Sequence, residues 1–150
     1  MAIPVRSHTA GTFFITTATH DRRRVFQVTA NAQLLINTLE RYRKNFLLHA
    51  YAIMPDHIHL ILTPGDISLE RCMQLIKGGF SHALGSKLPV WQRGFTDHRL
   101  RDPQSAAHHC KYVAQNPIEA RLVERAEDYL FSSAHADALR LDPLPEHLRG

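Results

Sequence analysis

The chain has 150 residues, a length that fits one domain with a single hydrophobic core. Apolar residues make up 44% of it, which argues against a disordered chain, and no apolar run approaches the length of a membrane span. Its two cysteines, Cys72 and Cys110, lie far apart and form neither a zinc motif nor a disulfide framework. We therefore expect a cytoplasmic protein that makes no contact with a membrane.

The positive charge is concentrated in the first third of the chain, although the net charge is only +4. Residues 1–45 carry seven Lys and Arg against two Asp and Glu, whereas residues 103–150 carry five against seven. The basic third includes the run Arg22-Arg23-Arg24. Clustered arginines neutralise phosphates, so a polyanionic partner is one interpretation of this asymmetry, and a solvated basic face is the other.

The first half of the chain shows two kinds of periodicity. Residues 12–19 are β-branched and aromatic, which predicts a strand. From Thr29, a candidate N-cap, apolar residues recur every three or four positions and predict a helix. Residues 47–53 and 57–63 predict two more strands, joined into a hairpin by the turn Met54-Pro55-Asp56.

The second half begins with another helix and strand. Ser68 is a candidate cap for a helix that ends at Gly85. Residues 90–101 predict a fourth strand with irregular parts. Inside the helix, each glycine of Lys77-Gly78-Gly79 costs roughly 1 kcal/mol relative to alanine. That cost suggests close backbone approach to DNA or to another helix, and a helix break is the alternative.

A third helix is predicted from Pro103, because proline is accommodated at the first helical position. We expect it to end before Asn116-Pro117, with a short helix near 118–125 after it. The element order β-α-β-β-α-β, then helix, is the ferredoxin-like split βαβ pattern of an α+β fold. It predicts an antiparallel sheet with helices on one face and a C-terminal tyrosine-bearing helix. We place one domain at residues 1–133 and a tail at residues 134–150.

Two histidines occupy one face of the third predicted strand. Because side chains alternate along a strand, Ile58, Leu60 and Leu62 would face the core. His57 and His59 would then lie side by side on the opposite face. Two imidazoles so placed can hold one metal ion and leave its other positions open to a phosphoryl oxygen. The alternative is an ordinary exposed pair, since the chain has 11 histidines.

Tyr112 and Asn116 stand four residues apart on the third predicted helix and share a face, together with His108. A tyrosine hydroxyl is a weak nucleophile at neutral pH, but beside a metal that binds a phosphate it can attack phosphorus and form a covalent intermediate. Asn116 would supply a further metal ligand through its carbonyl oxygen. The alternative is that Tyr112 packs in the core and Asn116 caps the helix end.

Six motifs in a fixed order carry a family resemblance. They are Tyr51–Leu60 (YAIMPDHIHL), Ile76–Gly78, Val90–Gln92, Gly94–His98 (GFTDH), Tyr112–Pro117 (YVAQNP) and Asp128–Ser133 (DYLFSS). Together they resemble the single-tyrosine HUH transposases, and most closely the transposase-like proteins associated with repetitive extragenic palindromes. The resemblance spans residues 12–133.

The resemblance implies a ferredoxin-like HUH fold and a divalent ion, Mg²⁺ or Mn²⁺, held by His57 and His59 and completed by Asn116. It implies that Tyr112 attacks single-stranded DNA, becomes linked to the 5′ phosphate and releases a 3′ hydroxyl that can reverse the reaction. Relatives recognise hairpins with short flanking single strands, as monomers or dimers, which implies the same partners and a nucleoid-associated place here. Magnesium prefers oxygen ligands, so two histidines suit manganese better.

The resemblance also makes the basic third of the chain the expected DNA surface. Trp91 and Phe95 could stack on unpaired bases, with a core position as the alternative for Trp91. Two other functions stay open: a non-catalytic module that binds nucleic acid on an exposed sheet, and a metal hydrolase that activates water and needs no Tyr112. The expected DNA contacts are Arg22, Arg23, Arg24, Lys77, Trp91 and Arg93.

Overall fold

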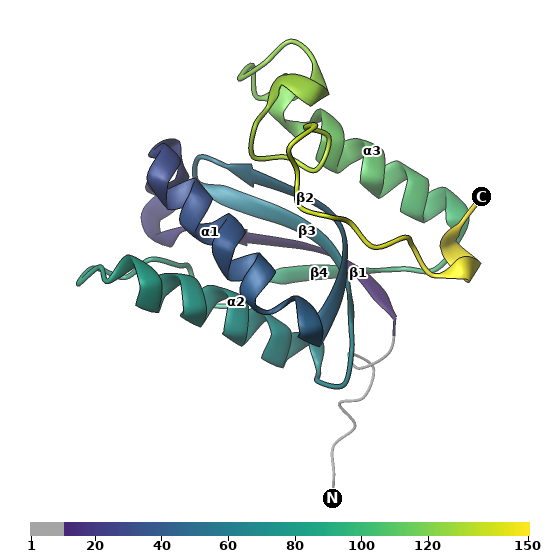
Figure 1. Ribbon diagram of the computed structural model, residues 1–150, viewed down its shortest axis with the longest axis horizontal. Helices are drawn as coiled ribbons and strands as arrows, with labels where there is room; N and C mark the ends of the chain where they lie inside the picture. The colour runs from purple at the N-terminus through teal and green to yellow at the C-terminus, as the bar shows by residue number, and fades with distance from the viewer. Residues whose placement is uncertain (1–10) are drawn as a thin grey trace, which may run out of the picture.

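The computed structural model describes residues 11–150, which fold around a four-stranded antiparallel sheet (Figure 1). The strand order is β2-β3-β1-β4, the order of the split βαβ fold, so the predicted α+β, ferredoxin-like class is confirmed. No helix within residues 11–150 is long and apolar enough to cross a membrane. The strands are β1 (Thr12–Ala18), β2 (Phe46–Met54), β3 (His57–Pro64) and β4 (Thr96–Leu100).

Two helices, α1 (Thr29–Arg41) and α2 (Leu69–Leu84), lie side by side on one face of the sheet (Figure 1). We call this the α1/α2 face. Alternation along β3 turns Ile58, Leu60 and Leu62 toward it, and all three side chains are fully buried, as predicted. Burial of this apolar surface is the main source of the stability of the domain.

The predicted ends of α2 are confirmed by its capping geometry. The Ser68 hydroxyl accepts a hydrogen bond from the Arg71 backbone N–H at 3.1 Å, and Gly85 ends the helix with a φ of 67°, a left-handed value that favours glycine. At α1 the prediction was wrong by one residue. Val28 holds the cap position without a side-chain hydrogen bond, and Thr29 is already helical.

The two central glycines of α2 have different surroundings. The helix runs through both, so the alternative of a helix break is wrong. A Cβ on Gly79 would lie 2.7 Å from Tyr42 Cε2, which shows that α1 is the helix that approaches the backbone there. A Cβ on Gly78 would meet nothing within 4 Å.

The third helix, α3 (Pro103–Glu119), lies on the opposite face of the sheet, mainly over β2 (Figure 1). We call this the α3 face. Asp102 caps the helix by accepting a hydrogen bond from the Ser105 N–H at 2.8 Å. The predicted end was wrong, because α3 continues through Pro117 to Glu119, and no separate helix follows at residues 120–125. Burial of Pro117 offsets the single backbone hydrogen bond that its ring removes.

The fourth strand is shorter than its predicted range of 90–101. It begins at Thr96, because Gly94 adopts a φ of 76° and turns the chain out of the sheet before that point. Trp91, in the predicted range, makes only an isolated bridge to Thr19.

The segment after residue 130 runs along the outer edge of β2 (Figure 1). Backbone hydrogen bonds join Ile53 to Phe131, Tyr51 to Ser133 and Leu48 to Asp142. Leu148 is buried in the cluster between β2 and α3. The predicted tail, residues 134–150, therefore contacts the sheet, and the boundary at residue 133 stays a prediction.

Candidate active site

The histidine pair lies on the α3 face of β3. The ring centroids of His57 and His59 are 4.9 Å apart, and the rings meet edge to face. His59 is buried and His57 is partly buried. The alternation that buries Ile58 between them therefore places the two imidazoles side by side, as the sequence predicts.

Each imidazole is held by a polar neighbour at its Nδ1 atom. His57 Nδ1 lies 2.8 Å from Asp56 Oδ1, and His59 Nδ1 lies 2.9 Å from Thr16 Oγ1 on the adjacent strand β1. Histidines that bind metals usually have such a partner on one nitrogen, because it orients the ring and leaves the other nitrogen free as a ligand. In this arrangement, Nε2 of each ring is therefore the nitrogen that remains available to bind a metal ion.

Asn116 of α3 brings an oxygen to the same place. Within residues 11–150, neither His59 Nε2 nor Asn116 Oδ1 has a hydrogen-bond partner, although both atoms are buried. Burying a polar atom without a partner costs about 1–3 kcal/mol, so two such atoms together call for an explanation. A cation bound between them would satisfy both, which makes the donor set fit a metal ion.

The protonation of His59 also suits a ligand. The pKa of His59 is lowered to about 4, mainly by burial and in addition by the nearby His57, while the Asn116 side chain opposes the shift. At neutral pH the ring is therefore uncharged, as metal binding requires. No group of three His, Cys, Asp or Glu side chains in the described chain is placed to hold a metal, so a site here depends on an amide such as that of Asn116.

Tyr112 lies over this pair, one helical turn before Asn116. Its ring centroid is 5.4 Å from that of His59 and 5.8 Å from that of Phe14, and both contacts are edge-on. The side chain is 43% exposed, which contradicts the alternative that Tyr112 is a core residue. His109 of the same helix turns toward the sheet, where its ring contacts Phe14 at 4.9 Å.

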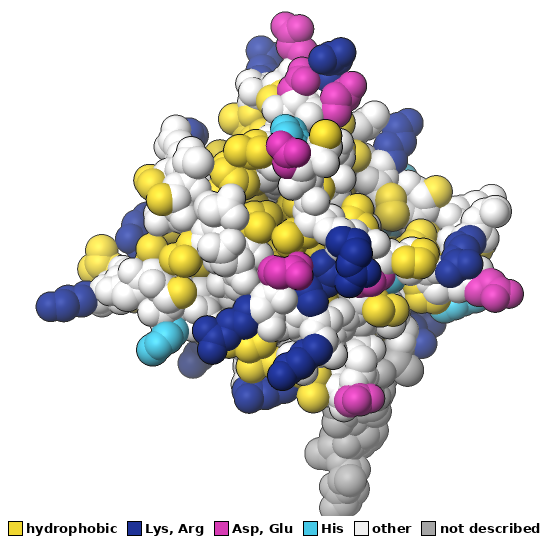
Figure 2. Space-filling model, in the orientation of Figure 1, with side chains coloured by type: hydrophobic (Ala, Val, Ile, Leu, Met, Phe, Trp, Pro, Cys, Tyr) yellow, Lys and Arg dark blue, Asp and Glu magenta, His cyan; other side chains and the backbone are white. Residues whose placement is uncertain are grey.

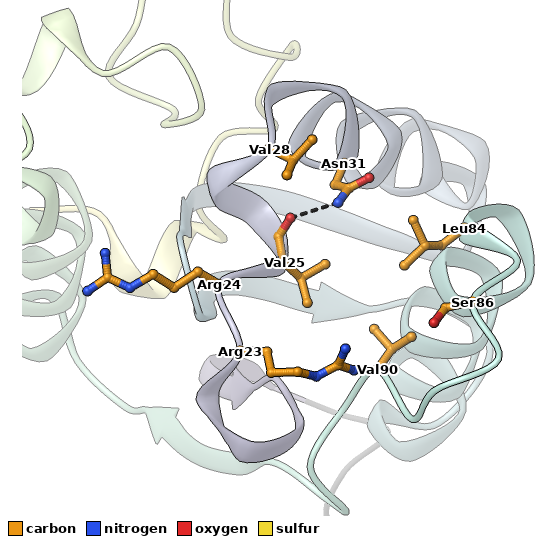
Figure 3. Close-up of a pocket in the computed structure, with 8 residues that line it drawn as sticks. All are labelled: Arg23, Arg24, Val25, Val28, Asn31, Leu84, Ser86 and Val90. Carbon is orange, nitrogen blue, oxygen red and sulfur yellow. Dashed lines mark hydrogen bonds between the residues drawn. The ribbon is translucent and has the colours of Figure 1, made fainter.

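The basic run divides between the two sides of the molecule. Arg22 Nε lies 3.2 Å from Asp56 Oδ2, and Arg24 lines a cavity that also contacts Asp56 and His57. Arg23 donates to the Pro89 carbonyl at a second cavity, on the α1/α2 face, which Arg24 also lines. Figure 3 shows Arg23 extended toward Val90 and Arg24 pointing the other way. Two of the three arginines thus lie near the histidine pair.

Lys77 and Trp91 lie on the α1/α2 face, away from the pair. Lys77 Nζ donates to the carbonyls of Gln92 (3.0 Å) and Gly94 (2.6 Å), and Trp91 Nε1 donates to the Lys77 carbonyl. The Trp91 ring packs against Phe26 and Phe80, which favours the core alternative. Arg93 is exposed in the loop before β4, and its role in DNA binding stays a prediction.

Three neighbours of the pair were missed by sequence reasoning. Asp56 directly precedes His57, so adjacency was a usable signal. Thr16 and Phe14 reach His59 only through the pairing of β1 with β3, in which Thr16 is opposite His59.

In Figure 2, most Lys and Arg side chains lie in the lower half of the view, and Asp and Glu gather at the top, over the loop after α3.

Comparison with known proteins agrees with this geometry. The family model described as "Transposase IS200 like" matches residues 9–116. A REP-associated tyrosine transposase of Escherichia coli K12 is 31% identical over 134 residues, covering 87% of this chain and 80% of the relative. A Haemophilus influenzae Rd protein given the same name provisionally is 28% identical over 158 residues, covering 93% of this chain and 88% of the relative.

The fold is also similar to a solved structure. A REP-associated tyrosine transposase bound to a REP hairpin superposes with a TM-score of 0.78 at 29% identity, over 100% of this chain and 94% of the other. Three findings agree with the motifs in the sequence: the match to the family model, the similarity to the E. coli relative and the shared fold. The chain therefore belongs to the IS200-like transposase family.

Proposed function

We propose that the protein cuts and rejoins single-stranded DNA next to a hairpin, through a covalent bond between Tyr112 and the 5′ phosphate. The observation that carries the proposal is the placement of an exposed tyrosine over two buried polar atoms, His59 Nε2 and Asn116 Oδ1, that have no hydrogen-bond partner within residues 11–150. A tyrosine hydroxyl needs help from a nearby positive charge to act as a nucleophile at neutral pH.

His57, His59 and Asn116 would hold a divalent metal ion, and when bound such an ion supplies positive charge that polarises a phosphoryl oxygen. Asp56 and Thr16 hold the two rings in orientation, so their ligand nitrogens are fixed before DNA arrives. Two nitrogen ligands favour manganese over magnesium.

The strand chemistry balances without an external energy source. Tyr112 Oη forms a bond to phosphorus as the bond to the 3′ oxygen breaks, and that oxygen takes up a proton as a 3′ hydroxyl. Attack by the same or another 3′ hydroxyl on the phosphotyrosine restores a phosphodiester and frees Tyr112. One bond forms for each that breaks, so cutting and joining use the same site in opposite directions.

Hairpin-bearing DNA is the proposed partner because the solved relative that matches the whole chain is bound to a REP hairpin. Arg22 and Arg24 lie beside Asp56 and are suited to contact phosphates next to the scissile bond. A monomer or homodimer acting at the nucleoid, in the cytoplasm, is the setting we propose.

The proposal is tested with a labelled hairpin-bearing single strand and Mn²⁺. We expect a covalent protein–DNA adduct on a denaturing gel, lost in Tyr112→Phe and on chelation with EDTA. Tyr42→Phe is the matched control, because Tyr42 lies on the α1/α2 face and its substitution should leave the adduct intact.

Two outcomes would contradict the proposal. Cleavage that survives Tyr112→Phe would indicate a metal hydrolase that activates water. Hairpin binding with no cleavage by the wild-type protein, on several hairpin substrates, would indicate a non-catalytic binding module.

A further inference from the structure

Part of the sheet on the α3 face is left open beside Tyr112. Because α3 packs mainly over β2, the β4 side chains on this face, Thr96 and His98, are exposed. Leu100, at the far end of β4, is buried. An open shelf of sheet therefore extends from the candidate active site to the β4 edge.

Four rings form a continuous row from the active site across this shelf. Phe14 stacks on His59 with centroids 5.3 Å apart and planes 19° apart. Phe14 also contacts His109 at 4.9 Å, and His109 stacks on His98 at 4.9 Å with planes 22° apart. The row therefore begins at a proposed metal ligand and ends at an exposed imidazole on β4.

The outer pair of this row has the properties of a binding platform. His109 Nδ1 lies 2.8 Å from the Ser105 carbonyl oxygen, so its ring is held in place by its own helix. His98 lies flat on that fixed ring and is itself exposed. In the described chain no third metal-binding side chain completes a metal site with the two.

The charges near the His98–His109 pair permit the approach of nucleic acid. Alternation along β4 turns Asp97 to the opposite face of the sheet, so it does not lie beside His98. His108 is exposed on α3, and its ring meets that of His109 edge-on with centroids 5.2 Å apart. Flat rings beside positive or titratable side chains are the surface on which proteins stack unpaired bases.

We propose that the His98–His109 pair is a base-stacking platform that carries the single strand away from Tyr112 across the β1–β4 part of the sheet. The inference rests on the proposed function, because it concerns the path of the strand that Tyr112 would cut. Phe14 joins the platform to the histidine pair, so the strand would follow the ring row outward.

The test measures DNA affinity in a Tyr112→Phe background, which prevents cleavage. The probes are a fluorescein-labelled DNA hairpin with a randomised single-stranded extension, and the same hairpin without the extension. We expect His98→Ala to weaken binding of the extended probe about 5- to 20-fold, as for loss of one modest base stack, and to leave the blunt hairpin unaffected. His98→Phe, which keeps a flat ring, should restore the affinity.

His82→Ala is the matched control, because His82 is an exposed histidine on α2, on the other face of the sheet. Equal affinity of His98→Ala, His82→Ala and the parent for the extended probe would overturn the platform. So would a pH-dependent loss of adduct in His98→Phe, with Tyr112 restored and affinity unchanged, since that result assigns the pair to proton transfer. Both results leave adduct formation by the wild-type protein intact, whereas failure of the proposed function removes it.

Discussion

The two faces of the sheet have opposite properties, although they share the same strands. On the α1/α2 face, Ile58, Leu60 and Leu62 are fully covered by two helices. On the α3 face of the same strand, His57 and His59 come before Ile61, which is buried in a second apolar cluster, and one helix leaves part of the surface open. Over residues 57–60, the period of two along β3 thus places site and core side chains alternately on the two faces.

The largest expected effect separates the faces by stability. Leu60→Ala removes a fully buried side chain from the α1/α2 face and should lower the free energy of unfolding by about 2–5 kcal/mol. Tyr112→Phe, on the α3 face, should change it by less than about 0.5 kcal/mol, because the side chain is 43% exposed. Urea unfolding followed by circular dichroism measures both values, and similar losses in the two variants would show that the faces are not separate.

A second prediction concerns acid sensitivity, which should come from the α3 face. The pKa of His59 is lowered from 6.5 to about 4, so the unfolded chain binds this proton more tightly than the folded one. The stabilising effect is therefore full above pH 6.5 and is lost as the pH falls toward 4. The shift in the pKa of His59 corresponds to a change of about 3 kcal/mol in the free energy of unfolding.

The measurement is urea unfolding of the metal-free protein at about pH 7.5 and about pH 4.5, on either side of most of this window. His59→Gln should flatten the pH dependence by about that amount, and His82→Gln, an exposed position on α2, should not. A slope that His59→Gln leaves unchanged would place the acid sensitivity elsewhere, for instance at His49, whose pKa burial also lowers.

The smallest predicted effect tests how closely the α1/α2 face is packed. Gly78→Ala places a methyl group in open space and should stabilise the helix by about 0.5–1 kcal/mol. Gly79→Ala places a methyl group 2.7 Å from Tyr42 Cε2. The free energy of unfolding of this variant should be about 1–3 kcal/mol lower than that of Gly78→Ala. Thermal unfolding of the two variants compares them directly, and equal midpoints would mean that the Tyr42 ring moves aside freely.

Predictions from the sequence succeeded where the signal was local. The caps at Ser68 and Gly85 depend on one residue each, and the alternation of His57 and His59 depends only on the strand period. The end of α3 could not be predicted, because the burial of Pro117 is a tertiary effect that overrides its tendency to end a helix.

The surroundings of the site were less predictable than its centre. Thr16 lies beside His59, and His98 beside His109, on the α3 face. These positions can be predicted only from the register of β1 with β3 and with β4. The contacts of His109 with Phe14 and His98 depend on the rotation of α3 about its axis, which the spacing of Tyr112 and Asn116 does not fix to within one residue. Pairing register and helix rotation are both consequences of long-range packing.

The chain after residue 130 has a consequence for self-association. Its backbone hydrogen bonds to Leu48, Tyr51 and Ile53 occupy the outer edge of β2, which would otherwise be a row of unpaired amides and carbonyls. At the other edge, β4 is only five residues long and carries Asp97 and Arg99, and short, charged strands discourage a second chain from adding to the sheet. The two edges of the sheet are thus protected by different means. The β2 edge is covered by the chain after residue 130, and the β4 edge is a short strand with charged side chains.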